Sequence, residues 1–102
     1  MLNVLLVDDD SEFSDVVCHI VEFLGHNIDT AANLAEAQEW FVNNTFDHVF
    51  LDFMLPDGSG LHLVEHLQSI GKTPKITLIS TGNELVRPGQ VLKAGQIYES
   101  NS

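Results

Sequence analysis

The apolar residues of this chain follow two patterns that alternate along its length. Short apolar runs predict strands, and the nearly continuous ones predict central strands covered on both faces. Apolar residues spaced three and four positions apart predict helices with one buried side. The predicted strands are residues 2–7, 27–31, 48–51 and 76–79, and the predicted helices are residues 11–24, 33–42 and 60–70.

Local signals set the limits of these helices. Gly25 and Gly71 are typical of residues that end a helix. Asn33 followed by Glu36 three positions later has the pattern of a capping box, which begins a helix. The expected inward-facing residues are Phe13, Val17, Ile20, Val21 and Leu24 in the first helix, Leu34, Ala37 and Phe41 in the second, and Leu61, Val64 and Leu67 in the third. The end of the chain predicts a short helix at residues 88–93 and a brief fifth strand at residues 96–99.

Strands and helices that alternate with short connections predict right-handed crossovers and a parallel sheet. The fold class is therefore α/β, a doubly wound parallel sheet in one domain that takes up residues 1–102. In such sheets, binding sites form at the carboxyl ends of the strands, near the point where the strand order reverses.

Composition narrows the classes of partner. The chain carries 15 acidic and 4 basic residues, a formal net charge of −11. Such a surface repels nucleic acid and anionic membranes, so we expect no direct nucleic-acid binding and no membrane association by this domain. A single cysteine, Cys18, excludes an internal disulfide, and no basic leader or long apolar stretch is present. These features predict a cytoplasmic protein.

Carboxylates follow two of the predicted strands. Asp8, Asp9 and Asp10 come directly after the first strand, and Asp52 ends the third. The carboxyl ends of parallel strands meet at one edge of the sheet, so we expect these acids to converge there. Converging carboxylates repel each other unless a cation holds them. The sequence therefore predicts a divalent-cation site in which one acid is a candidate reactive group.

A hydroxyl after the fourth strand completes a set of residues that resembles the receiver domain of two-component response regulators. The resemblance rests on Val7-Asp8-Asp9-Asp10, on Leu51-Asp52-Phe53-Met54-Leu55-Pro56 with Gly60 beyond it, and on Ser80-Thr81-Gly82. It runs from residue 2 to about residue 98. The family has a flavodoxin-like doubly wound sheet, and it accepts a phosphoryl group from a sensor histidine kinase instead of turning over a substrate.

The resemblance implies a role for each matching residue. Asp52 would be the phosphoacceptor, Asp9 a direct ligand of Mg²⁺, Asp8 its water-mediated partner, and the Met54 backbone carbonyl a further ligand. Thr81 would be the hydroxyl that bonds the phosphoryl group and switches position, and Tyr98 the aromatic that moves with it. Magnesium favours oxygen ligands, which agrees with this set.

The chain departs from the family in two ways. The family has a lysine near the end of its fifth strand, whereas no lysine follows Lys93 here. The last helix of the receiver fold is also missing, which would uncover part of one sheet face. We expect either a fragment of a longer regulator, truncated or atypical at its C-terminal end, or a face covered by a second copy in a homodimer or by another partner.

The same residues allow three other interpretations. A degenerate receiver could act as a dimerisation or interaction module that does not depend on phosphorylation. A small aspartyl phosphatase needs a second acid two residues after its nucleophile, and Met54 stands there. The segment Asp57-Gly58-Ser59-Gly60 has the composition of a phosphate-binding loop, although a turn before a helix is the simpler interpretation.

Overall fold

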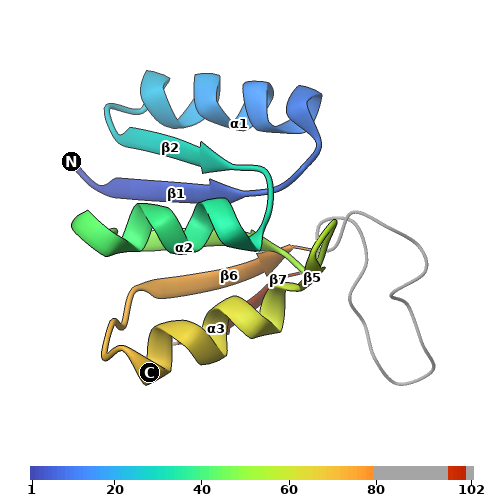
Figure 1. The fold of residues 1–102 in the computed structure, drawn as a ribbon. Coiled ribbons are helices and arrows are strands. Elements are labelled where there is room, and N and C mark those ends of the chain that lie inside the picture. The colour runs from blue at the N-terminus through green and yellow to red at the C-terminus, as the bar shows by residue number, and fades with distance from the viewer. Residues whose placement is uncertain (80–96, 101–102) are drawn as a thin grey trace.

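The computed structural model describes residues 1–79 and 97–100 of the chain, and these residues form an α/β fold (Figure 1). In chain order the elements are β1 (Asn3–Val7), α1 (Ser11–Phe23), β2 (Asn27–Ala31), α2 (Leu34–Asn43), β3 (His48–Asp52), β4 (Met54–Leu55), β5 (Gly58–Ser59), α3 (Gly60–Ser69), β6 (Lys75–Ile79) and β7 (Ile97–Ser100). Five strands build one sheet in the order β2-β1-β3-β6-β7, and β4 and β5 form a separate small hairpin.

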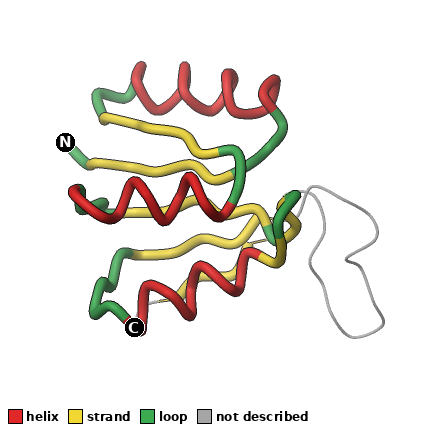
Figure 2. Tube along the Cα trace, viewed as in Figure 1, coloured by secondary structure: helices red, strands yellow, loops and turns green. Residues whose placement is uncertain are grey.

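The first four strands of the sheet are parallel, which confirms the predicted doubly wound fold. Strand β1 pairs with β2 on one side and with β3 on the other, and β3 pairs with β6. Helices α2 and α3 lie over one face of this sheet (Figures 1 and 2). The chain starts at β1, moves outward to β2 and crosses back to β3, so the strand order reverses between β1 and β3. A binding site is expected at that reversal.

The edge strand β7 departs from the expected parallel sheet. It matches the predicted fifth strand in position, but it pairs with β6 in the antiparallel sense, from Ile76 opposite Ser100 to Ile79 opposite Ile97. A parallel neighbour requires a crossover along the sheet, whereas an antiparallel neighbour starts at the end where the previous strand stops. The apolar pattern of a strand does not encode its direction, so the sequence could not distinguish the two.

The hydrophobic core lies between the sheet and helices α2 and α3. Leu5, Val7, Val49 and Leu51 are fully buried on the sheet side. The rest of the cluster is Ala31, Leu34, Ala37, Phe41, Phe46, Leu55, Leu63, Leu67, Ile76 and Leu78. The predicted inner face of α2 is thereby confirmed, and the packing fixes the strands whose ends carry the acids.

The predicted inner faces of α1 and α3 were wrong in part. Ile20 and Leu24 are 54% and 64% exposed, and the strand that α1 contacts most is the edge strand β2. In α3, Leu63 is buried, while Leu61 is 41% exposed. A helix with apolar residues on two adjacent stripes does not reveal which stripe faces the core.

Helix limits follow the local signals. Asp10 caps α1 by accepting hydrogen bonds from the Glu12 and Phe13 N–H groups. Gly25 and Gly71 follow α1 and α3 with φ of 90° and 75°, a left-handed conformation that glycine adopts without strain.

No helix in the described part of the chain is both long and apolar enough to span a bilayer. The predicted helix at residues 88–93 lies outside the described residues. The expected loss of the family's last helix is a separate expectation, and it stays a prediction.

Candidate functional site

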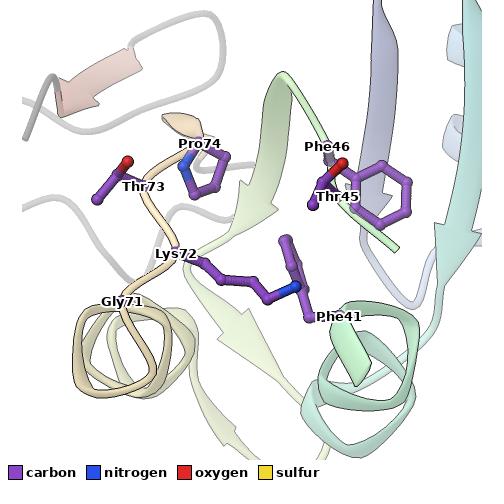
Figure 3. Close-up of a pocket in the computed structure, with 7 residues that line it drawn as sticks. All are labelled: Phe41, Thr45, Phe46, Gly71, Lys72, Thr73 and Pro74. Carbon is purple, nitrogen blue, oxygen red and sulfur yellow. The ribbon is translucent and has the colours of Figure 1, made fainter. Parts of the chain in front are cut away.

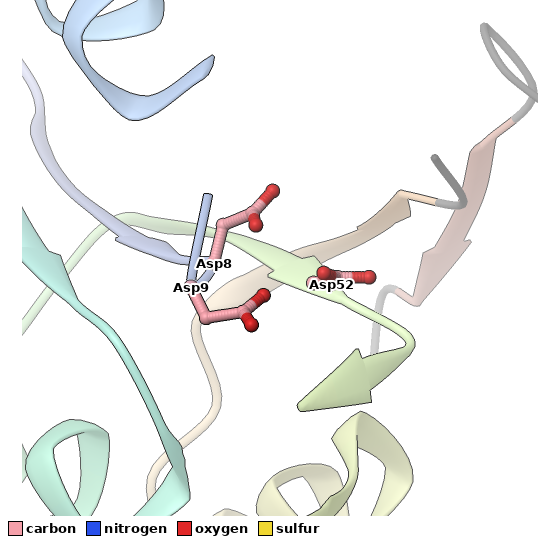
Figure 4. A group of neighbouring side chains, drawn as sticks. All are labelled: Asp8, Asp9 and Asp52. Atoms are coloured by element: carbon pink, nitrogen blue, oxygen red, sulfur yellow. The ribbon is translucent and has the colours of Figure 1, made fainter. Parts of the chain in front are cut away.

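Three carboxylates meet at the carboxyl ends of β1 and β3, as the sequence predicted. Val7 pairs with Leu51 in the sheet, so the next residues along, Asp8 and Asp52, stand side by side at the strand ends. Asp9 follows Asp8 in the loop to α1. Each of the three acids offers one oxygen, and these oxygens all lie within 4.8 Å of one another. Figure 4 shows the three side chains extending into the same space.

Two of these acids are buried, which alters their protonation. Asp8 is 4% exposed and Asp52 is 6% exposed, while Asp9 is open to solvent. Burial raises the pKa of Asp52 to about 7, and the charges of Asp8 and Asp9 add to the rise, although the Met54 N–H opposes it. Burial also raises the pKa of Asp8 above its usual range. The cluster is therefore costly to ionise without a cation.

The atoms at this site suit a hard divalent cation. Asp8 Oδ1 accepts the Asp10 N–H at 2.9 Å, but the buried Asp8 Oδ2 has no hydrogen-bond partner among the described residues. Asp52 Oδ1 accepts the Met54 N–H at 3.2 Å. The cluster contains only carboxylate oxygens, without histidine or cysteine, which fits Mg²⁺ or Ca²⁺ better than a softer metal. A bound cation would offset the repulsion, and water on the cation could donate to Asp8 Oδ2.

The raised pKa of Asp52 predicts how stability depends on pH without metal. The folded protein holds a proton on Asp52 up to about pH 7, whereas the unfolded chain loses it near the ordinary value of 3.8. This contribution to stability is therefore present at low pH and is lost as the pH rises through about 7. We expect Asp52→Asn to raise the free energy of unfolding of the metal-free protein by roughly 1–3 kcal/mol at about pH 8, with the gain vanishing toward pH ~4.

Urea unfolding of both proteins across this pH range in the presence of a chelator measures the difference. Asp29→Asn removes an exposed carboxylate on β2 that is not part of the cluster, so its stability curve should stay nearly parallel to that of the wild type. If the free energies of unfolding of wild type and Asp52→Asn differed by the same amount at every pH, the electrostatic explanation would be wrong.

The loop after Asp52 contains structure that the sequence did not reveal. Strands β4 and β5 pair in an antiparallel hairpin, with Met54 opposite Ser59 and Leu55 opposite Gly58. The Ser59 side chain caps α3 by accepting the Leu61 N–H. The segment from Asp57 to Gly60 is therefore a turn, a strand and a helix start, as the simpler interpretation held. The strands β4 and β5 have two residues each, which is too short for a strand pattern to be recognised in the sequence.

The Asp57 side chain is a further residue that sequence reasoning missed. Its two carboxylate oxygens accept the N–H groups of Leu34 and Ala35 at 2.9 and 3.1 Å, at the start of α2. These bonds lower the pKa of Asp57, the Leu34 bond most. Aspartate is common in turns, so nothing in the local sequence indicated a bond to a helix so far away in the chain.

The remaining predicted site residues are described only in part. Met54 begins β4 and is half exposed. Tyr98 lies on β7, where its backbone pairs with Leu78. Thr81 lies outside the described residues, together with the neighbouring Ser80 and Gly82. The proposed switching of Thr81 and Tyr98 therefore stays a prediction.

Two hollows border different parts of the fold. One of about 240 Å³ reaches the acidic cluster; its lining is Asp8, Asp9, Ser11, Ser14, Asp15, Cys18, Thr30, Ala31, Ala32 and Glu36. The other, of about 330 Å³, is lined by Phe41, Thr45, Phe46, Gly71, Lys72, Thr73 and Pro74 (Figure 3). Lys72 is the charged residue of this second lining and donates to the Asn44 carbonyl at 3.3 Å. This second lining offers no carboxylate, so of these two hollows only the first gives a cation access to acidic ligands.

Comparison with known proteins places this arrangement in context. A family model described as "Response regulator receiver domain" matches residues 4–98. The chain is 32% identical over 87 residues to the transcriptional regulatory protein CpxR of Escherichia coli, an alignment covering 85% of this chain and 37% of CpxR. It is 30% identical over 87 residues to a CpxR homolog of Haemophilus influenzae, with 85% and 38% covered. The chain thus spans less than two fifths of the length of these relatives.

Solved structures agree with the family match. The response regulator TrrA from Thermotoga maritima, solved in complex with Mg²⁺ and BeF, has a TM-score of 0.75 and 27% identity, covering 94% of this chain and 87% of TrrA. A CheY-like receiver domain protein from Methanospirillum hungatei has a TM-score of 0.73 and 28% identity, with 80% and 67% covered. The range of the family match, residues 4–98, includes the strand ends that carry the acids.

Proposed function

Because the chain belongs to the response regulator receiver family, we propose that Asp52 accepts a phosphoryl group and that Asp8, Asp9 and Asp52 hold Mg²⁺ beside it. Receiver domains are phosphoacceptors in two-component signalling and not enzymes in the usual sense. The observation that carries the proposal is the convergence of three carboxylate oxygens within 4.8 Å at the strand ends. The TrrA structure, which contains Mg²⁺ and BeF, supports the choice of cation.

The transfer needs a carboxylate nucleophile and positioning more than acid–base help. An Asp52 carboxylate oxygen forms a bond to phosphorus while the bond from phosphorus to the donor breaks, and the leaving group keeps that electron pair. The product is an acyl phosphate on Asp52. A bound Mg²⁺ would neutralise charge on Asp52 and on the phosphoryl oxygens. The Met54 N–H, which donates to Asp52 Oδ1, helps to orient the carboxylate.

Other residues complete the proposal. Asp9 is the direct carboxylate ligand of the cation, Asp8 its water-mediated partner, and the Met54 carbonyl a further ligand. Thr81 bonds the phosphoryl group and Tyr98 moves with it, which gives the fold two arrangements.

The proposed donor is a sensor histidine kinase, which the family membership implies, and the proposed location is the cytoplasm. With a net charge of −11, the domain does not itself bind nucleic acid in this proposal.

Metal-dependent formation of an acyl phosphate tests the proposed function. We expect incubation with acetyl phosphate and Mg²⁺ to produce a phosphoprotein that hydroxylamine cleaves, because acyl phosphates react with this nucleophile. A chelator should prevent the reaction, since the three carboxylates would then repel the donor. Intact-protein mass spectrometry measures the product. An unmodified mass, with Mg²⁺ binding absent in calorimetry, would overturn the proposal.

A second function is favoured by the surface of α1. Val16, Ile20, Phe23 and Leu24 are 58%, 54%, 89% and 64% exposed, which is unusual for a single helix side in a monomer. The alternative is a receiver that works as an interaction module independent of phosphorylation, for example as a homodimer. Sedimentation of the same samples distinguishes the two, because stable self-association without any labelling supports the module. A monomer that becomes labelled excludes it.

A further inference from the structure

The start of helix α2 is capped from two directions. The first four N–H groups of a helix lack partners within the helix. Here the Glu36 N–H donates to the Asn33 side chain at 2.8 Å, and the first bond within the helix runs from the Ala37 N–H to the Asn33 carbonyl at 3.1 Å. The Leu34 and Ala35 N–H groups donate instead to the two oxygens of Asp57. A carboxylate at this end also complements the helix dipole.

Asp57 belongs to the segment that leaves the acidic cluster. It lies in the turn between β4 and β5, and β4 begins two residues after Asp52. The hairpin has only two paired positions, too few to hold itself in place. Its position therefore depends on contacts with the rest of the fold, and Asp57 supplies two hydrogen bonds at its tip.

Packing supports the same attachment. Gly58, next to Asp57, lies so close to Leu34 that a Cβ added there would be 3.1 Å from Leu34 Cδ1. At the other end of the hairpin, the Gly60 N–H donates to the Phe53 carbonyl at 2.7 Å. The hairpin is thus fixed at its tip by α2 and at its base by its own backbone.

The start of α2 is also connected to the other half of the acidic cluster. The Asp8 N–H donates to the Ala31 carbonyl at 2.9 Å, and the Ala32 N–H donates to Glu36 Oε1 at 2.9 Å. The end of β2 therefore bonds to the backbone of Asp8, and the loop that follows it bonds to the helix that Asp57 caps. Through it, the segment after β1 and the segment after β3 share one support.

We propose that Asp57 is a positioning residue for the cation site, which anchors the β4–β5 hairpin to α2 and thereby holds Met54 and Asp52 in place opposite Asp8 and Asp9. This inference rests on the proposed function, because it assumes that the cluster binds Mg²⁺ with the help of the Met54 carbonyl. Asp57 does not touch the cation; it acts through the backbone that carries two of the ligands.

The test compares two ways of weakening the same helix cap. Asp57→Ala removes both bonds to α2 and releases the hairpin, whereas Asn33→Ala removes a cap of α2 and leaves the hairpin attached. Asp57→Asn keeps an acceptor oxygen for one N–H while removing the charge, so it separates anchoring from electrostatics. Calorimetric titration with MgCl₂ at ~0.15 M salt, where distant charges are screened, gives the Kd of each full-length variant.

We expect Asp57→Ala to raise the Kd for Mg²⁺ by about tenfold, as the loss of an outer-shell support does. Asp57→Asn should fall between Asp57→Ala and the wild type, and Asn33→Ala should change the Kd less than ~2-fold. Amide hydrogen exchange should quicken at Leu34 and Ala35 in Asp57→Ala. Thermal melting without metal establishes that each variant is folded. If Asp57→Ala does not fold, Asp57→Asn takes its place in the comparison of Kd values.

The outcomes separate this inference from the proposed function. If wild type binds Mg²⁺ but Asp57→Ala and Asn33→Ala shift the Kd equally, Asp57 is only a helix cap and the inference fails. Equal weakening by Asp57→Asn and Asp57→Ala would attribute the effect to charge and would also overturn it. If wild type binds no Mg²⁺, the proposed function fails and the inference falls with it.

Discussion

Replacing Asp52 with asparagine is expected to abolish phosphoryl labelling of the chain by acetyl phosphate, a loss of at least ~100-fold in rate, because the nucleophile itself is removed. The asparagine side chain would keep an oxygen that can accept the Met54 N–H, so the local geometry should persist. An amide oxygen carries no full charge and does not form a stable bond to phosphorus. Mass spectrometry and hydroxylamine sensitivity measure the loss.

The matched control is Asp29→Asn, which makes the same change of charge at an exposed position on β2. It should be labelled at the wild-type rate. Unfolding measurements without metal add a second criterion, since Asp52→Asn should be at least as stable as the wild type above about pH 7. Undiminished labelling of Asp52→Asn would assign the phosphoryl group to another residue.

The substitution Gly60→Ala is expected to give the largest loss of stability, about 3 kcal/mol or more. A Cβ at this position would overlap the backbone oxygen of Asp52 and lie 3.1 Å from Leu51 Cγ. Backbone and a fully buried leucine cannot move aside cheaply in a packed core. The first turn of α3 or the end of β3 would have to shift, and the site would shift with it. Urea unfolding measures the change.

Gly25→Ala separates close packing from backbone strain. Gly25 has φ of 90°, and a Cβ there would meet no atom within 4 Å. The loss of stability in Gly25→Ala therefore comes from the left-handed conformation alone and should be ~1–2 kcal/mol. Gly60 has no such conformation, so its cost arises from contact with Asp52 and Leu51. If Gly60→Ala lost no more stability than Gly25→Ala, α3 would have to move aside from Asp52 and Leu51 at only a small cost, which would contradict the expectation.

Much of the candidate site could be predicted from the sequence. Asp8 and Asp9 follow one apolar run and Asp52 ends another, and parallel strands bring their carboxyl ends to one edge. Predicting that the three acids converge thus required only the order of the strands. The degree of burial, which raises the pKa of Asp52 to about 7, depended on how loops and neighbouring strands cover each acid. The sequence did not contain that information in any local pattern.

The parts that could not be predicted involve contacts between distant residues. Asp57 and Leu34 are 23 positions apart, and an aspartate in a turn has the same local signature whether or not it caps a helix. Gly60 could have been an ordinary start of a helix, and its contact with Asp52 appears only when β3 and α3 are packed. The direction of β7 likewise depends on the path of the chain and not on its apolar pattern.

The sequence by itself determined the alternation of strands and helices, most of their limits, the parallel arrangement of the first four strands and the three acids at their ends. The elements and their limits follow from periodicity and caps, which act over a few residues, and the parallel arrangement follows from the alternation of strands and helices along the chain. Only the tertiary structure decided which side of α1 and α3 is buried, which way β7 runs, and that Asp57 ties the loop after Asp52 to α2. Those features arise from packing between segments far apart in the chain, where several arrangements satisfy the same local pattern and the one that fills the core is adopted.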